Sequence, residues 1–204
     1  SEGAGLGNKF LSHIREVSII AHVVRAFEDP NIIREGSVGP KEDYEAIETE
    51  LILADLQTIQ QAQGKVKRFQ KQIEKDAIDK LFKGLNEEKP AREIVLSDEE
   101  QAFAQSFFLL SAKPELIVLN VSEQALKDAE KITQNYADKL GISQDKCVLI
   151  CAKIEAELAE LSEEEQKEYL EGLGLKEPGL ERLIKKAYKT LGLISFLTCG
   201  EKEV

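Results

Sequence analysis

The sequence has no methionine, no tryptophan, two histidines and three cysteines in 204 residues. The histidines, His13 and His22, provide little material for a zinc site or for a catalytic triad built on histidine. Cys147, Cys151 and Cys199 lack the even number and the spacing of a disulfide framework, which is typical of proteins from a reducing cytosol. Cys147 and Cys151 lie in an apolar run, so we expect them to be core thiols.

Long apolar runs and a positive net charge are also missing. No run approaches the ~20 apolar residues of a membrane span, and no stretch resembles a signal peptide. The net charge of −11 argues against wholesale binding to nucleic acid, although it allows a local basic patch. We expect a cytoplasmic protein with no membrane contact and no sequence-specific DNA binding. Because no initiator methionine is present, we also expect a part of a longer chain.

Three short apolar segments have the composition of buried β-strands. Leu116–Glu123 (LIVLNVSE) opens with four consecutive β-prone residues, a pattern typical of parallel strands buried on both faces. Val17–Phe27 and Lys146–Lys153 (KCVLICAK) have the same character. Helical patterns follow at Gln124–Leu140, Ile154–Leu161, Glu163–Leu170 and Leu180–Leu191, with Gly141 as a C-cap, and Leu193–Thr198 has the pattern of a further strand. The alternation predicts an α/β fold with a parallel sheet and right-handed crossovers.

Two of the predicted strands end in short polar tails, Asn120–Glu123 and Cys151–Lys153. In parallel sheets, ligands bind beyond the carboxyl ends of the strands. The Asn120 amide can donate and accept at once, which suits the edge of a purine, and the Glu123 carboxylate can accept from ring or exocyclic N–H groups. If the two strands are neighbours, their tails converge on one pocket. Alternatively, Ser122 simply caps the following helix.

Between the first two strands, the pattern changes to that of a helical insertion. Apolar and small residues recur every three or four positions in a heptad-like stripe: Tyr44, Ile47, Leu51, Ala54, Thr58, Ala62, Lys65 and Phe69. A second helix, about Glu74–Leu85, can pack back on the first. Ser97 and Glu100 form a capping box that begins a third helix, whose apolar face contains Phe103, Phe107 and Leu110. The insertion is thus a helical hairpin with a return helix.

The tip of this hairpin is basic, in contrast to the acidic chain. From Lys65 to Lys83 there are seven basic residues against three acidic ones. The basic residues nearest the tip are Lys65, Lys67, Arg68, Lys71 and Lys75. Clustered lysines are favourable against RNA phosphate because counterions are released. The alternative is a solvated coiled-coil surface with i,i+4 ion pairs.

Taken together, these motifs resemble those of a known family. NVSE, followed about thirty residues later by CAK, resembles the last two base-reading motifs of the translation-factor-related P-loop NTPases. The similarity is greater to the Obg-like ATPases of the YchF family. It covers nearly the whole chain through GAGLGNKFLSHIRE, HVVRAFED, ETELILADL, AKPELIVLNVSE, AKIEAELAEL and TLGLISFLTCGEKEV. The hairpin is the least specific part of the resemblance.

The resemblance implies a nucleotide-binding role for both polar tails. Asn120 would bind the purine edge, and Val121 would pack on the base or present its backbone to it. Ser122 lies within this motif, and Glu123 replaces the usual aspartate, a departure that goes with ATP preference. Cys151 replaces a serine, the next residue, Ala152, would offer its N–H to the base, and Lys153 would offer its aliphatic stem.

The resemblance also implies a fold and its division into parts. The fold would be an α/β, parallel-sheet P-loop NTPase (G-domain) core with an inserted helical coiled-coil hairpin. Residues 1–40 would be a first G-domain part, with Gly3, Gly5 and Gly7 in the second switch region. Residues 41–110 would be the coiled-coil insertion and residues 111–192 the C-terminal G-domain part with the base-binding loops. Residues 193–204 would begin a TGS domain.

The implied activity is ATP (or GTP) hydrolysis by a ribosome-associated protein that regulates translation or stress response. Ribosome or ribosomal RNA would meet the helical arm. The G-x-x-x-x-G-K-[ST] motif is absent from these 204 residues, so the Mg²⁺ ligands and catalytic groups would lie outside this chain. We expect the segment alone to be inactive. The alternative function is a non-catalytic interaction module whose arm binds a protein or RNA partner.

Overall fold

A computed structural model describes residues 10–27, 39–65 and 71–196 of the chain. Several residues with expected roles therefore lie outside the described residues: Gly3, Gly5, Gly7, Lys67, Arg68, Phe69, Cys199 and the predicted TGS entry at Gly200–Val204. The first described element is a short helix over residues 10–16. Its apolar residues Phe10 and Leu11 lie four and three positions before Ile14, as on one face of a helix.

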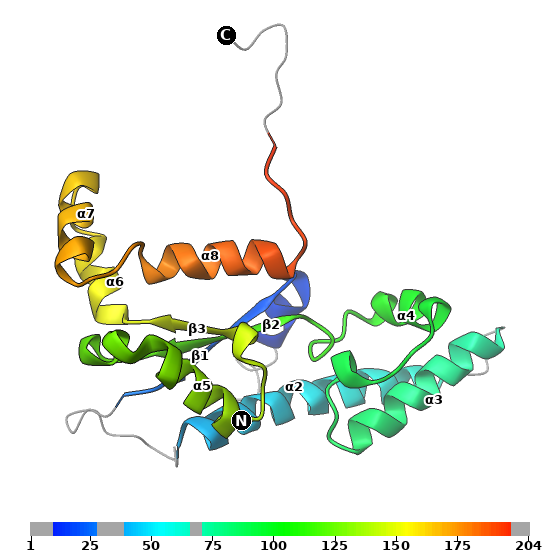
Figure 1. Cartoon of the computed structure of the whole chain (residues 1–204). Coiled ribbons are helices and arrows are strands. Elements are labelled where there is room, and N and C mark those ends of the chain that lie inside the picture. Colours follow the sequence, from blue (N-terminus) through cyan, green and yellow to red (C-terminus); the bar gives the residue numbers. More distant parts are fainter. Residues whose placement is uncertain (1–9, 28–38, 66–70, 197–204) are drawn as a thin grey trace, which may run out of the picture.

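Three parallel strands form the sheet, in the order β1-β2-β3 (Figure 1). The strands are β1 (Ile20–Arg25), β2 (Glu115–Asn120) and β3 (Cys147–Ile150). Arg25 pairs with Asn120, and Asn120 with Ile150, so the carboxyl ends lie in register at one edge. Each strand is shorter than the segment predicted from the sequence.

Helices cover both faces of this sheet, which explains why Leu116–Leu119 of its central strand are all apolar and buried. On one face, α2 (Pro40–Gln63) and α5 (Ala129–Leu140) pack over Val24, Ile117 and Leu119. On the other face lies α8 (Gly179–Thr190) (Figure 1). Its Leu183 packs against Val118 and Val148. The predicted α/β layering with a parallel sheet is confirmed.

The chain after β2 departs from the prediction in one respect. Gln124–Leu140 is not a single α-helix, because a 3₁₀ helix, η4 (Glu123–Asp128), precedes α5. Gly141 ends α5 with φ 69°, a left-handed conformation that glycine adopts without a Cβ penalty, as predicted. The remaining elements are η5 (Gln144–Lys146), α6 (Ala152–Leu158) and α7 (Glu163–Gly172). Leu193–Phe196, predicted as part of a strand, pairs with no described strand.

The insertion forms a helical arm that projects away from the sheet (Figure 1). It consists of α2, α3 (Gln72–Asn86), η2 (Ala91–Glu93), α4 (Asp98–Ala104) and η3 (Gln105–Phe107). Ile59, Ile78 and Leu85 lie at its core, each at most 1% exposed. The predicted capping box is present, with Glu100 N–H donating to Ser97 Oγ at 3.3 Å and Ser97 N–H donating to Glu100 Oε2 at 2.7 Å. The predicted hairpin and return helix are confirmed.

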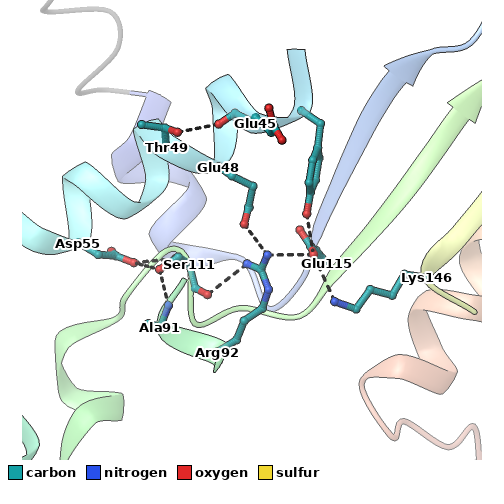
Figure 2. Close-up of polar contacts among 10 residues, drawn as sticks. Glu45, Glu48, Thr49, Asp55, Ala91, Arg92, Ser111, Glu115 and Lys146 are labelled. Carbon is teal, nitrogen blue, oxygen red and sulfur yellow. Dashed lines mark hydrogen bonds and ion pairs between the residues drawn. The ribbon is translucent and has the colours of Figure 1, made fainter. Parts of the chain in front are cut away.

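The spacing placed an exposed residue of α2 in the apolar stripe and left out a buried carboxylate. Ile47 is 42% exposed, whereas the fully buried Asp55 was absent from the predicted stripe. Asp55 accepts hydrogen bonds from the Ser111 N–H and hydroxyl, both at 2.7 Å (Figure 2). It also accepts from Leu110 N–H at 2.7 Å. These bonds compensate the carboxylate for the water it has lost. Asp55 thereby fixes the turn that leads from the arm into β2.

A second buried polar cluster joins the arm to the sheet (Figure 2). The Glu115 carboxylate, at the start of β2, accepts from Tyr44 of α2 at 3.1 Å, Arg92 of η2 at 2.9 Å and Lys146 of η5 at 3.3 Å. Arg92 also binds Glu48 of α2 at 2.5 Å. Burial, followed by the charge of Glu115, raises the pKa of the Tyr44 phenol, which therefore stays protonated as a donor.

Replacing Arg92 by methionine tests the stabilising role of this cluster. The change would leave Glu48 without its buried partner and Glu115 with one fewer, so we expect the free energy of unfolding to fall by about 3 kcal/mol. Urea denaturation measures the loss. Lys89→Met is the matched control, because Lys89 pairs with Glu87 on the surface and should change little. Adding Glu48→Gln to Arg92→Met should restore part of the stability; equal effects of Arg92→Met and Lys89→Met would contradict this role.

The stability should also depend on pH through His22, whose ring lies 5.3 Å from that of Tyr44. Burial lowers the pKa of His22 below 6.5, with Glu115 and Asp43 opposing the shift. The His22 imidazole therefore binds a proton more readily in the unfolded chain than in the folded one. The free energy of unfolding falls as pH drops below 6.5, by at most about 1.4 kcal/mol per pH unit for one proton.

Unfolding curves between pH 7.5 and pH 5 cover the pH range around the pKa of a free histidine. The difference in unfolding free energy between wild type and variant measures the contribution of His22. His22→Gln should flatten the decline at acid pH. The matched control is His13→Gln at the exposed second histidine, which should leave the decline unchanged. An identical pH profile for His22→Gln and wild type would show that the His22 proton is not linked to folding.

Candidate functional site

The two polar tails meet at the carboxyl edge of the sheet. β2 and β3 are neighbours, and Val121 N–H donates to the Ile150 carbonyl at 2.9 Å, which extends their pairing by one residue. Beyond it, Ala152 N–H donates to Asn120 Oδ1 at 3.1 Å. Because β2 and β3 are neighbours, the structure brings Asn120–Glu123 and Cys151–Lys153 side by side, which the sequence predicted only on that condition.

Alternation along the strands directs two of the predicted side chains away from this edge. Val121 is 2% exposed and belongs to the core beneath α2 and α5. Cys151 is 4% exposed and packs with Ile154 and Leu158 under α6 and α7. Neither side chain can contact a ligand at the edge, so only their backbone groups remain available. Of the two roles expected for Val121, packing on the base does not fit its burial, whereas presenting its backbone to the base stays a prediction. Cys151, which replaces a serine, likewise keeps only its backbone for a ligand. Cys147 and Cys151 are buried free thiols, as predicted.

The other predicted side chains remain accessible. Asn120, Ser122 and Glu123 are partly exposed, and Ser122 precedes η4 without a side-chain capping bond. The Lys153 side chain is 74% exposed, and its ammonium lies 3.9 Å from Glu157 one turn further along α6. Asn120 Oδ1 accepts from Ala152 N–H, whereas Asn120 Nδ2 donates no hydrogen bond to the described residues. The same bond occupies the N–H that the sequence assigned to the base.

Two carboxylates of α6 hold the elements around this edge. Glu155 accepts from Gly179 N–H at 2.8 Å and from Leu180 N–H at 3.1 Å, satisfying two free donors at the start of α8. Glu157 accepts from the Tyr169 hydroxyl of α7, and this hydrogen bond raises the pKa of Tyr169 to about 12. α6, α7 and α8 are therefore tied together next to the two tails.

The basic tip of the arm is only partly described. Lys65 and Lys71 are exposed, and Lys75 is partly exposed. Among the described residues of the tip region, Lys80 is neutralised by Glu100, with both carboxylate oxygens at 2.8 Å from its ammonium. In the part of the chain that the structure describes, no three His, Cys, Asp or Glu side chains gather as a metal site, and no helix there is long and apolar enough to span a membrane.

Sequence reasoning missed the buried charged groups, above all Asp55, Arg92 and Glu115. It also missed a cleft of about 980 Å³ between residues 12–18, the arm and the turn before β2. A weak signal existed, because Asp55 and Glu48 lie on the buried side of a helix whose pattern is otherwise apolar. Glu115 directly precedes the LIVLNVSE segment, but nothing in the sequence pairs it with Arg92, and only the folded chain brings them together.

Comparison with known proteins adds independent evidence. No family model matches the chain. It is 44% identical to the "Ribosome-binding ATPase YchF" of Bacillus subtilis and 41% identical to that of Escherichia coli O157:H7, over 100% of this chain and 58% of each relative. The solved structure of the Schizosaccharomyces pombe YchF GTPase superposes with a TM-score of 0.77 at 31% identity, covering 95% of this chain and 55% of that one.

The chain thus spans somewhat more than half the length of the curated relatives that it matches. The likeness extends through both polar tails and the arm, since all of this chain is aligned. The predicted G-domain type of core is confirmed by the structural neighbour. The chain therefore belongs to the YchF family.

Proposed function

We propose that this chain is the base-reading and arm region of a cytoplasmic, ATP-preferring nucleotide hydrolase that associates with ribosomes. The observation that carries the proposal is the meeting of the two tails, where Ala152 N–H donates to Asn120 Oδ1 at 3.1 Å. The names of the relatives, a ribosome-binding ATPase and a GTPase, support it. Mg²⁺ and the transferred phosphate would be held by groups outside these residues, and the chain alone should release no phosphate from ATP.

The arrangement at the edge favours adenine over guanine. Adenine presents an N7 acceptor next to an N6 donor, whereas guanine presents two acceptors, N7 and O6. Asn120 Nδ2 can donate to N7, and the Glu123 carboxylate can accept from an amino group. The Ala152 N–H that could serve guanine O6 already donates to Asn120. A site with one free donor and one acceptor matches adenine better.

The arm supplies the proposed contact with ribosomal RNA. Lys65 and Lys71 are exposed near its tip, and neither has an ion-pair partner among the described residues. Such lysines gain most from phosphate because they release counterions without breaking an internal bond. Lys80, which is paired with Glu100, would contribute less. The contact would be with the RNA backbone, since the only aromatic residue of α3 is the partly buried Phe82 of the arm core.

Replacing Asn120 tests the base-binding role separately from the structural one. In Asn120→Asp, a side-chain oxygen can still accept from Ala152 N–H, but the Nδ2 donor is lost. We expect the loop to persist and adenosine binding to weaken by about tenfold, the value of one hydrogen bond of about 1.4 kcal/mol. Titration of the isotope-labelled chain with adenosine and guanosine, followed by NMR shifts of the Ala152 amide, measures both effects.

The matched control is Asn135→Asp, an exposed position on α5 with the same change in charge, which should leave adenosine binding unchanged. Asn120→Ala should lose both the binding and the hydrogen-exchange protection of the Ala152 amide. Equal shifts with adenosine and guanosine would sink the adenine preference. No response to either nucleoside would favour the alternative, a non-catalytic module that acts through the arm.

Charge reversal tests the arm. Changing Lys65, Lys71 and Lys75 to glutamate should weaken co-sedimentation with ribosomes at low salt by at least tenfold, because three counterion-releasing contacts become repulsive. The control reverses three exposed lysines next to and on α5, Lys127, Lys131 and Lys139, which gives the same change in net charge. Equal losses in both triple variants would indicate a general charge effect, and unchanged sedimentation of the arm variant would return these lysines to a solvated coiled-coil surface.

A further inference from the structure

A cleft lies where the arm leaves the sheet, far along β2 from the two polar tails. It has a volume of about 980 Å³ and is lined by residues 12–18, by parts of α2, α3 and α4, and by the turn before β2. The proposed nucleotide site uses none of these groups. Arg15 donates to the Phe108 carbonyl and to the Thr58 hydroxyl, both at 3.1 Å, so residues 12–18 are bonded to the arm across the cleft.

The inner wall of the cleft is apolar. Leu81 of α3 and Leu109 of the turn, 1% and 4% exposed, belong to the core of the arm. Leu96 and Phe107 pack against the same core and remain partly exposed toward the cleft. The Gln101 and Gln105 amides stand at the edge of this surface. Such a wall suits an apolar side chain flanked by polar backbone.

The lip of the cleft is an exposed aromatic ring held in an unusual backbone conformation. Phe108 is 64% exposed and has φ 49°, a left-handed conformation that is unfavourable for a bulky residue. Its carbonyl accepts from Arg15 at 3.1 Å, and the next residues are fixed by Asp55, which binds Leu110 and Ser111. The hydrogen bonds of the buried Asp55 thus hold Phe108 in a strained conformation with its apolar ring in solvent. Such strain points to a function of the ring.

The charge of the cleft is positive and incompletely balanced. Arg15 lies 4.0 Å from the Asp55 carboxylate. Lys113 donates to the carbonyls of Arg15 and Val17 at 3.0 and 2.6 Å, and it forms no ion pair within the described residues. Glu16 is the one carboxylate among the lining residues, and it is exposed. An ammonium group with three N–H donors and two acceptors retains one donor for a ligand.

We propose that this cleft binds a peptide segment of a partner protein in which an apolar or aromatic residue is followed by an acidic one. The apolar side chain would lie against Phe108 and the leucine wall, and the carboxylate would meet Lys113. RNA is the weaker candidate, because a single unbalanced ammonium next to Glu16, on a chain of net charge −11, offers little to a polyanion. The inference is independent of the proposed nucleotide site.

The probe is the acetylated, amidated pentapeptide Ala-Phe-Glu-Leu-Ala, compared with its Glu→Gln analogue. Titration into the isotope-labelled chain should shift the amides of Gln105, Phe108 and Lys113, with the glutamine analogue about tenfold weaker, as expected for losing one charge-assisted hydrogen bond. Lys113→Met should abolish the preference for glutamate. Lys131→Met, at an exposed lysine of α5, should preserve it. Because the readout is a ratio of affinities, a loss of stability in Lys113→Met does not imitate the result.

Phe108→Gly separates function from structure. Glycine adopts φ 49° without strain and keeps the carbonyl that Arg15 binds, so the midpoint of unfolding should not fall while peptide binding weakens severalfold. Phe196→Gly, at a ring 76% exposed outside the cleft, is the control and should bind as wild type. A lower midpoint with intact binding would show that the ring is structural and overturn the proposal. So would equal affinity for both peptides, absence of binding at millimolar peptide, or displacement of the peptide by a uridylate decamer.

Discussion

The buried carboxylate of Glu115 determines how the two parts of this molecule are joined. It accepts from groups on α2, η2 and η5, three elements far apart in sequence (Figure 2). Isolating such a carboxylate from water is costly, and hydrophobic residues of similar size could give as much stability. The arrangement gives instead a single geometry, because only one orientation of the arm brings Tyr44 and Arg92 to the same oxygen. We infer that this cluster sets the angle at which the arm leaves the sheet.

β2 extends this constraint to the other end of the molecule. Glu115 is its first residue and Asn120 its last, so about 17 Å of buried, doubly hydrogen-bonded strand separates the arm junction from the candidate base site. At one end the strand receives Arg92 and Tyr44, and at the other it holds the Ala152 loop. A displacement of β2 along its axis would therefore break hydrogen bonds at both ends, those of Glu115 and that of Asn120. The fold thus places the junction of the arm and the candidate base site on one rigid strand.

Much of this fold could be predicted from the sequence because periodicity reports burial. The parallel sheet, the hairpin, the Ser97–Glu100 capping box and the Gly141 cap follow from local patterns. Asp55 left only a weak signal, since a carboxylate in a helix pattern indicates solvent unless its partners are known, and the first of these is 55 residues away. The left-handed Phe108 was equally hidden, because phenylalanine is not a residue that signals this conformation. The missed features are those that depend on distant residues.

The candidate base site shows the same division between local and distant information. The sequence predicted that the two tails would meet if β2 and β3 were neighbours, as they are. What each residue offers a ligand depends instead on the direction of its side chain. A period of two sends Val121 inward directly after Asn120 points out, and this could have been anticipated from the strand pattern. The bond between Asn120 Oδ1 and Ala152 N–H could not. It uses a donor that the family resemblance assigned to the ligand, and so leaves Asn120 Nδ2 and the Glu123 carboxylate as the free groups. The chemistry at this edge follows from which hydrogen bonds the protein has already made with itself.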